Sequence, residues 1–166
     1  MRSPFLFNVA DLAAPGSTRS ELIETGVDWA LDMSASDPDV PLVAHLELRS
    51  LTGGILVRGD VSVAVQHTCH RCLAEYVEEH DVPVAAMFMA EPDDDSYEMT
   101  GVRLDVEQML RDEVLLAMPL LPRCRDDCPG VVSSPGTELN TGASGDDGDL
   151  AGSPFAVLRD LLDRGT

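Results

Sequence analysis

The chain has 166 residues, which is enough for one domain with a substantial core and too few for two. Its 30 acidic residues oppose 11 basic ones, all of them arginine, and the net charge of −19 disfavours a wide nucleic-acid footprint because it repels phosphate at long range. No apolar run approaches the roughly 20 residues that span a bilayer, and the N-terminus does not resemble a signal peptide, so we expect a cytoplasmic protein with reduced cysteines.

The first half of the chain is predicted to form β-strands. Residues 4–9 are an apolar run typical of a strand, and the mixed pattern over 19–33 indicates one more strand, which Gly26 interrupts. Apolar and polar residues then alternate over 40–48 and over 55–65. A pair of glycines lies between these two runs, so they are predicted to form a hairpin.

A further strand, an acidic stretch and a helix follow. The strand is predicted over 76–89, where Pro83 favours an edge or a bulge because proline cannot donate to a ladder. The carboxylates of 91–101 match no calcium loop, which favours a solvated loop. Residues 104–118 have the periodicity of an amphipathic helix that ends at Pro119, and Asp105 and Gln108 fit a capping box at its start.

The composition changes after residue 128. Residues 129–152 are rich in Gly, Ser and Asp and predict a disordered linker, and residues 153–166 predict a short amphipathic helix with Ser153 as its N-cap. We therefore expect an α+β domain over 1–128, with an antiparallel β-sheet of four to six strands and one packed amphipathic helix. The linker and the C-terminal helix would follow this domain.

The cysteines form two closely spaced pairs, Cys69 with Cys72 and Cys124 with Cys128. Each pair can direct two thiolates toward one ion from a single tight turn, so the pattern predicts a tetrahedral metal site, with zinc as the first candidate. The alternative is that the cysteines are ordinary free thiols at the ends of turns.

Three arginines lie beside these cysteines in the sequence, namely Arg71, Arg123 and Arg125. If the two turns meet, the three side chains would form a small RNA-binding patch, because phosphate can be bound at short range even by a protein that repels it at long range. The alternative is that they only neutralise Asp126 and Asp127.

The sequence contains no phosphate-binding glycine loop, nucleophile elbow or recognisable catalytic triad, so we predict that the protein is not an enzyme. His67 and His70 flank the first cysteine pair and could serve as ligands or as a general base. On an alternating strand, however, His67 is more often a partly buried structural residue.

Several segments occur in the order found in one known family. They are Gly59-Asp60, Cys69-His70-Arg71-Cys72-Leu73, the helical segment 111–119, the turn 124–130, Gly136 with Leu139-Asn140, and 154–158. On these segments the chain resembles the YceD family of large ribosomal RNA subunit accumulation proteins. The cysteine-rich members have a further C-x-x-C after Cys128, and Val132 and Pro135 stand at those positions here. Either the four remaining cysteines complete the site, or packing alone holds the turn.

The resemblance implies a non-enzymatic role in large ribosomal subunit biogenesis, in support of 23S ribosomal RNA accumulation. The implied partners are large-subunit ribosomal RNA or its precursor particle, and a small basic large-subunit ribosomal protein. An acidic holdase for that basic protein, without direct RNA contact, is the main alternative, because a strongly acidic surface attracts basic proteins. A nuclease or RNA-modifying enzyme is a third, weaker hypothesis.

The composition of 129–152 leads to a first prediction. A segment with so little apolar surface to bury should be the first site of cleavage in limited proteolysis. Amide protection there equal to that of the 104–118 helix, measured by hydrogen exchange, would contradict the linker interpretation.

Overall fold

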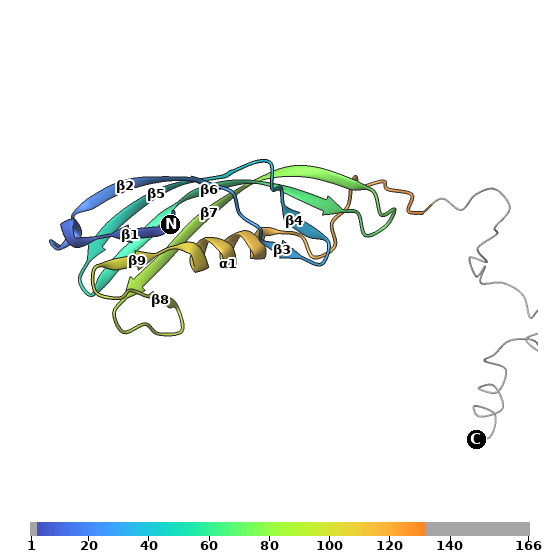
Figure 1. The fold of residues 1–166 in the computed structure, drawn as a ribbon. Helices are drawn as coiled ribbons and strands as arrows, with labels where there is room; N and C mark the ends of the chain where they lie inside the picture. Colours follow the sequence, from blue (N-terminus) through green and yellow to red (C-terminus); the bar gives the residue numbers. More distant parts are fainter. Residues whose placement is uncertain (1–2, 132–166) are drawn as a thin grey trace, which may run out of the picture. The chain divides into compact units, whose positions relative to one another are not determined.

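Alternation of apolar and polar side chains in three long strands produces the main feature of the fold, a curved sheet with one buried face. The computed structural model describes residues 3–131, and in it these strands are β5 (Leu42–Leu51), β6 (Gly54–Thr68) and β7 (Glu75–Met89). They pair antiparallel in that order. Figure 1 shows them crossing over the helix α1 as one continuous layer.

Shorter strands extend this layer to a sheet of seven. β2 (Thr18–Thr25) pairs with β5, and β4 (Ser34–Ser36) pairs with the far end of β6, beyond the end of β5. β3 (Ala30–Leu31) pairs with β4, and β8 (Ser96–Glu98) runs parallel to the end of β7. A separate two-stranded ribbon joins β1 (Leu6–Asn8) to β9 (Arg103–Asp105), and a 3-10 turn, η1 (Ala10–Leu12), follows β1.

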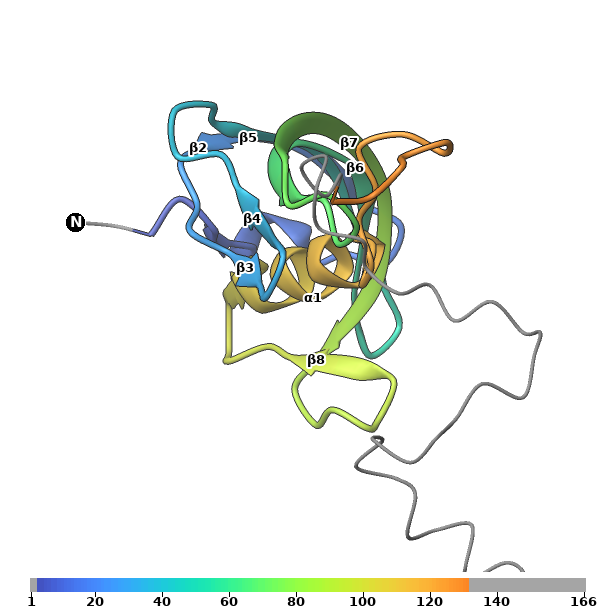
Figure 2. The same ribbon diagram turned by 90° about the vertical axis from the view of Figure 1, so that its right-hand side faces the viewer.

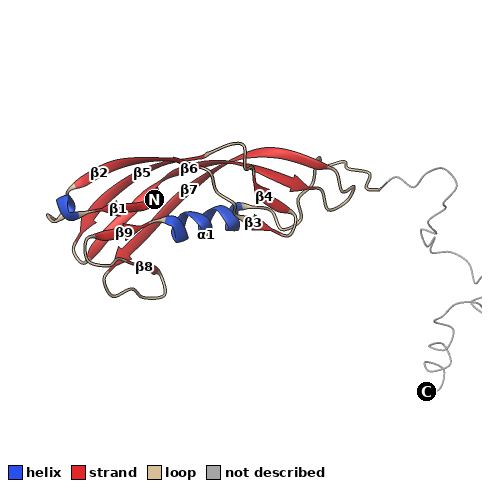
Figure 3. Cartoon of the chain, in the orientation of Figure 1, coloured by secondary structure: helices blue, strands red, loops and turns tan. Residues whose placement is uncertain are grey.

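The helix α1 (Glu107–Ala117) packs on the buried face of the sheet. Its Met109, Leu110 and Val114 are buried in the same core as Val57 of β6 and Phe88 of β7. Figure 2 shows β6 and β7 arching over α1, and Figure 3 shows α1 in blue beneath the strands of the sheet. It is the one α-helix of the described residues. The described part of the chain is therefore a mostly antiparallel sheet with a single packed helix, in agreement with the sheet and the packed helix predicted for it.

The predicted start of the helix is wrong by three residues. Leu104 pairs with Phe7 in the β1–β9 ribbon, so it belongs to a strand and not to the first turn of the helix. The predicted capping box is also absent, because the N-cap residue is Val106, whose side chain makes no capping hydrogen bond. Asp105 Oδ1 does accept the N–H of Glu107, at 3.0 Å. The predicted end is confirmed: Met118 is extended, as a residue before proline prefers to be.

The strand predictions are correct in type and less accurate in number. The predicted single strand over 19–33 is two strands, β2 and β3, and the sheet has seven strands in place of four to six. Pro83 does lie on an edge, because within the described residues β7 pairs on its second side only over Met87–Met89. In the acidic stretch, Asp93 Oδ1 accepts the Ser96 hydroxyl at 2.6 Å, so this carboxylate organises a turn before β8.

Two predicted regions fall largely outside the structure. The linker over 129–152, apart from its first three residues, and the helix over 153–166 lie outside the described residues. None of the described helices is long and apolar enough to cross a membrane.

A close approach of two strands yields a stability prediction. A Cβ added at Gly59 would collide with the backbone carbonyl oxygen of His45 on the neighbouring strand, whereas one added at Gly26 would meet nothing within 4 Å. We expect Gly59→Ala to lower the free energy of unfolding by about 3 kcal/mol, and the control Gly26→Ala to change it by less than about 1 kcal/mol. Equal denaturation midpoints for the two variants would contradict this account of the β5–β6 pairing.

Candidate metal centre

The first cysteine pair lies in the tight turn that joins β6 to β7. The N–H of Cys69 donates to Ala74 O at 2.9 Å, and the N–H of Leu73 donates back to Cys69 O at 2.9 Å. Leu73 has a φ of 61°, the left-handed conformation that a non-glycine residue adopts at a cost of about 1 to 2 kcal/mol. This turn brings Cys72 back toward Cys69.

The second pair lies in the segment that follows α1, and two hydrogen bonds attach this segment to the first turn. The backbone N–H of His70 donates to Pro122 O at 2.9 Å, and the Nδ1–H of the same residue donates to the same oxygen at 2.8 Å. A carbonyl oxygen can only accept, so Nδ1 carries the proton. His70 therefore joins the two turns, and the predicted ligand role for it is not needed.

The four thiols meet in one cluster. Their sulfur atoms all lie within 4.8 Å of one another, with Cys69 Sγ 3.8 Å from Cys128 Sγ and Cys72 Sγ 3.7 Å from Cys124 Sγ. Two sulfurs bound to one tetrahedral zinc ion lie about 3.8 Å apart, because each Zn–S bond is about 2.3 Å, whereas disulfide sulfurs lie about 2.05 Å apart. The cluster thus has the dimensions of a tetrathiolate site and could hold a metal ion.

The electrostatics of the cluster also suit a cation. Donation from the backbone of Cys124, helped by the backbones of Cys72 and Arg71, lowers the pKa of Cys69 to about 5 although burial opposes it. Burial and the neighbouring thiols raise the pKa of Cys124 to about 12. The thiolate form is thus favoured at Cys69 and disfavoured at Cys124. Four thiolates at this spacing need a positive ion to offset their repulsion.

The three predicted RNA-binding arginines are all exposed around this cluster. Arg71 and Arg123 directly follow the residues that join the turns, His70 and Pro122, so they emerge from adjacent backbone. Arg125 Nε lies 3.3 Å from Asp127 Oδ1, which is the neutralising contact that the sequence offers as an alternative. Within residues 3–131, neither Arg71 nor Arg123 has such an ion pair.

A second group of possible ligands, which sequence reasoning missed in part, lies next to the first. His67 Nε2 is 3.0 Å from His80 Nε2, and Glu78 Oε2 is 4.0 Å from His80 Nε2. His67 is fully buried, as its strand position indicates, and burial together with His80 lowers its pKa while Glu78 opposes the shift. The sequence signal was Glu78-x-His80 on a strand, since alternating residues share a face.

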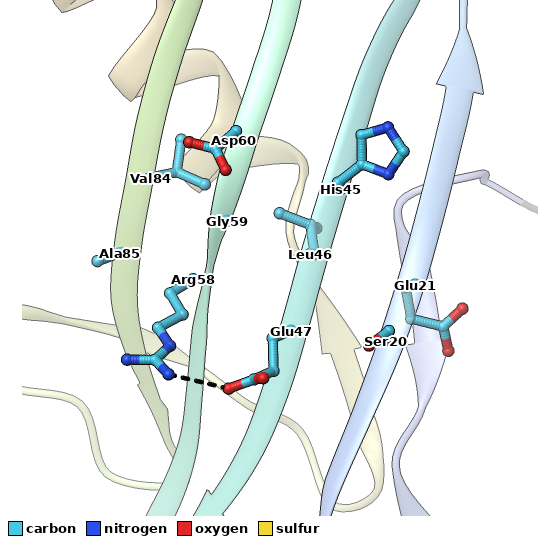
Figure 4. A pocket seen from close by; sticks show the side chains of 10 residues that line it. All are labelled: Ser20, Glu21, His45, Leu46, Glu47, Arg58, Gly59, Asp60, Val84 and Ala85. Atoms are coloured by element: carbon cyan, nitrogen blue, oxygen red, sulfur yellow. Dashed lines mark hydrogen bonds and ion pairs between the residues drawn. The ribbon is translucent and has the colours of Figure 1, made fainter.

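The outer face of the sheet contains an open hollow above Gly59. Figure 4 shows Glu21, Glu47 and Asp60 around it, with Arg58 held by Glu47 at 3.2 Å. His45 also borders the hollow. Glu21 is itself paired with Arg19 at 2.7 Å, which leaves Glu47 and Asp60 against the paired guanidinium of Arg58. This balance makes the surface better suited to a basic partner than to phosphate.

Comparison with known proteins gives one family. The sequence model of the family described as "Large ribosomal RNA subunit accumulation protein YceD" matches residues 57–162. The matched segment includes all four cysteines and the three arginines of the cluster. No solved structure matches the chain.

Curated relatives come from mycobacteria. Uncharacterized proteins from Mycobacterium tuberculosis and Mycobacterium bovis are each 31% identical in an alignment over 149 residues that covers 82% of this chain and 72% of the relative. An uncharacterized protein from Mycobacterium leprae is 26% identical over 148 residues, covering 82% of this chain and 68% of the relative.

The thiol geometry predicts a tightly held ion. We expect wild-type protein purified after growth with ample zinc to retain about one metal ion per chain through dialysis. The Cys72→Ser variant should lose this ion and unfold at a lower temperature, because structural metal binding contributes to the stability of the fold. Elemental analysis and thermal unfolding measure the two effects. The control Val77→Ser alters an exposed residue of the same hairpin, and it should keep the ion. A normally folded, metal-free wild type with the same unfolding temperature as Cys72→Ser would contradict the prediction.

Proposed function

Since the chain belongs to the YceD family, we propose that it is a non-enzymatic cytoplasmic factor in large ribosomal subunit biogenesis, which supports the accumulation of 23S ribosomal RNA. We further propose that Cys69, Cys72, Cys124 and Cys128 bind one zinc ion with a structural role. A site with four protein ligands leaves no open position for a substrate, which is the pattern of structural zinc.

The observation that carries the RNA part of the proposal is the junction of the two cysteine turns. Because His70 is bonded to Pro122 through both its backbone and its ring, Arg71 and Arg123 emerge together beside the cysteine cluster. A guanidinium binds phosphate in a bidentate manner, and two adjacent ones can contact successive phosphates. Arg125 completes the proposed patch when phosphate replaces its exposed contact with Asp127.

Long-range repulsion does not prevent this contact. With a net charge of −19 the protein repels RNA at a distance, but at physiological salt the screening length is about 8 Å, so only charges near the patch act on a bound phosphate. The proposed RNA contact is therefore short and strongly dependent on salt.

A second candidate function is favoured by the acidic outer face. The carboxylates of Glu47 and Asp60 beside the hollow offer a surface for a small basic large-subunit ribosomal protein. In this case the protein acts as a holdase and makes no direct contact with RNA.

Two matched triple variants distinguish these functions. The test variant replaces Arg71, Arg123 and Arg125 with serine, and the control replaces the three exposed residues Arg49, Arg103 and Arg111, so both lose the same charge. We expect the test variant alone to lose co-sedimentation with precursor large-subunit particles. In a filter-binding assay with 23S ribosomal RNA, the slope of log affinity against log salt should fall in magnitude by about 2 to 3.

The contrary result is equally clear. If both triple variants, with circular dichroism spectra like that of the wild type, sediment with the particles, the arginine patch is not the ligand site. If neutralising Glu47 and Asp60 then abolishes the association, the basic protein is the ligand.

A further inference from the structure

Three side chains beside the cysteine cluster are arranged as ligands, and we propose that they form a second metal site, for a divalent first-row transition ion such as Zn²⁺. The ligand atoms are His67 Nε2, His80 Nε2 and a carboxylate oxygen of Glu78, which all lie within 4.8 Å of one another. This site is separate from the four thiols and does not depend on the proposed function.

The register of the β6–β7 hairpin brings the three side chains together. His67 lies opposite Tyr76, and Glu78 and His80 follow at alternate positions of β7, so all of them project from the same face of the sheet. Both strands are 15 residues long and are paired along their whole length. The ligands are thus fixed by a rigid ladder instead of a loop.

A buried hydroxyl orients the first ligand. Ser34 Oγ lies 2.7 Å from His67 Nδ1, and Ser34 is 4% exposed. Ser34 lies in β4, a three-residue strand that pairs with the end of β6 and places Ser34 directly opposite His67. When Nδ1 donates to this oxygen, Nε2 has a free lone pair that faces His80. Metal-binding histidines are commonly held in this way through their second nitrogen.

The spacing of the nitrogens suits one ion between them. Two imidazole nitrogens on a tetrahedral zinc ion lie about 3.3 Å apart, because each Zn–N bond is about 2.0 to 2.1 Å, and the observed separation is 3.0 Å. Without an ion, the two Nε2 atoms can share only one proton between them. An ion engages both lone pairs, and the carboxylate of Glu78 offsets part of its charge.

The site is open on one side. The side chain of Glu78 is 56% exposed and that of His80 is 19% exposed, whereas His67 is fully buried. An ion can therefore enter past Glu78, and three protein ligands leave a coordination position for water. With fewer ligands and more solvent than the thiol cluster, this site should bind zinc more weakly and exchange it more readily.

Zinc titration of the full-length protein tests the proposal. Protein that retains its dialysis-resistant ion is titrated with Zn²⁺ in excess Mg²⁺, which occupies exposed carboxylates because it prefers oxygen ligands. We expect the wild type to bind one more zinc ion. Ser34 only holds a ligand, and loss of such a residue costs about 10- to 100-fold in metal affinity, so we expect that loss for Ser34→Ala. His80→Gln and Glu78→Gln each remove a ligand, so they should bind the second ion at least about 100-fold more weakly than the wild type.

Matched controls exclude effects of charge and of composition. Glu79→Gln removes the same charge from the opposite face of β7, and His45→Gln removes an exposed histidine from the outer face of the sheet. Both should bind the second ion as the wild type does. Cys72→Ser, where its circular dichroism matches that of the wild type, should also keep it.

Three results would overturn the proposal. They are a wild type that binds no second zinc ion, equal binding by His80→Gln and His45→Gln, and loss of the second ion in a folded Cys72→Ser variant. The last result would mean that zinc binds only to the thiol cluster.

Discussion

The arrangement of the proposed functional surface depends on the attachment of one turn to another. The turn between β6 and β7 carries Cys69 and Cys72. The segment after α1 carries Cys124 and Cys128 and has no strand or helix of its own between Ala117 and Val131. This segment is attached to the first turn by the two hydrogen bonds from His70 to Pro122, by donation from the Cys124 backbone to Cys69, and by the meeting of the four sulfurs. Two hydrogen bonds contribute only about 1 to 3 kcal/mol together, so a metal ion is the stronger candidate for the clamp.

The junction of the two turns brings two arginines together on an acidic protein. Two arginines of the sheet are engaged by carboxylates, Arg19 by Asp11 and Glu21, and Arg58 by Glu47. Arg71 and Arg123 have no such contact in the described part of the chain, and the bond from His70 to Pro122 brings their backbones next to each other. Screening makes the local arrangement more important than the total charge for a bound phosphate, whereas the total charge governs the approach of a basic protein. The two proposed functions therefore use different faces of the same molecule.

Sequence reasoning succeeded where one physical signal dominates. Alternation predicted the β5–β6 hairpin, the missing N–H of Pro83 predicted an edge, and Pro119 predicted the end of α1. Sequence reasoning failed where the same apolar pattern is compatible with both a helix and a strand. Leu104 fits the apolar periodicity of a helix, yet it pairs in the β1–β9 ribbon, because tertiary pairing overrides local periodicity.

The candidate sites show the same limit. The spacing of the cysteines was sufficient to predict that the two pairs could meet, since each pair defines its own turn. The group of His67, Glu78 and His80 could not be predicted without the register of the hairpin, and Ser34 reaches His67 only because the short strand β4 pairs with the end of β6. Such short strands carry almost no periodic signal.

X-ray absorption at the zinc edge, on the full-length protein after dialysis has removed exchangeable ions, tests the central claim most directly. The account predicts a first shell of four sulfur atoms at about 2.3 Å from the retained zinc ion. A first shell dominated by nitrogen or oxygen, or a folded protein with no retained zinc, would contradict it.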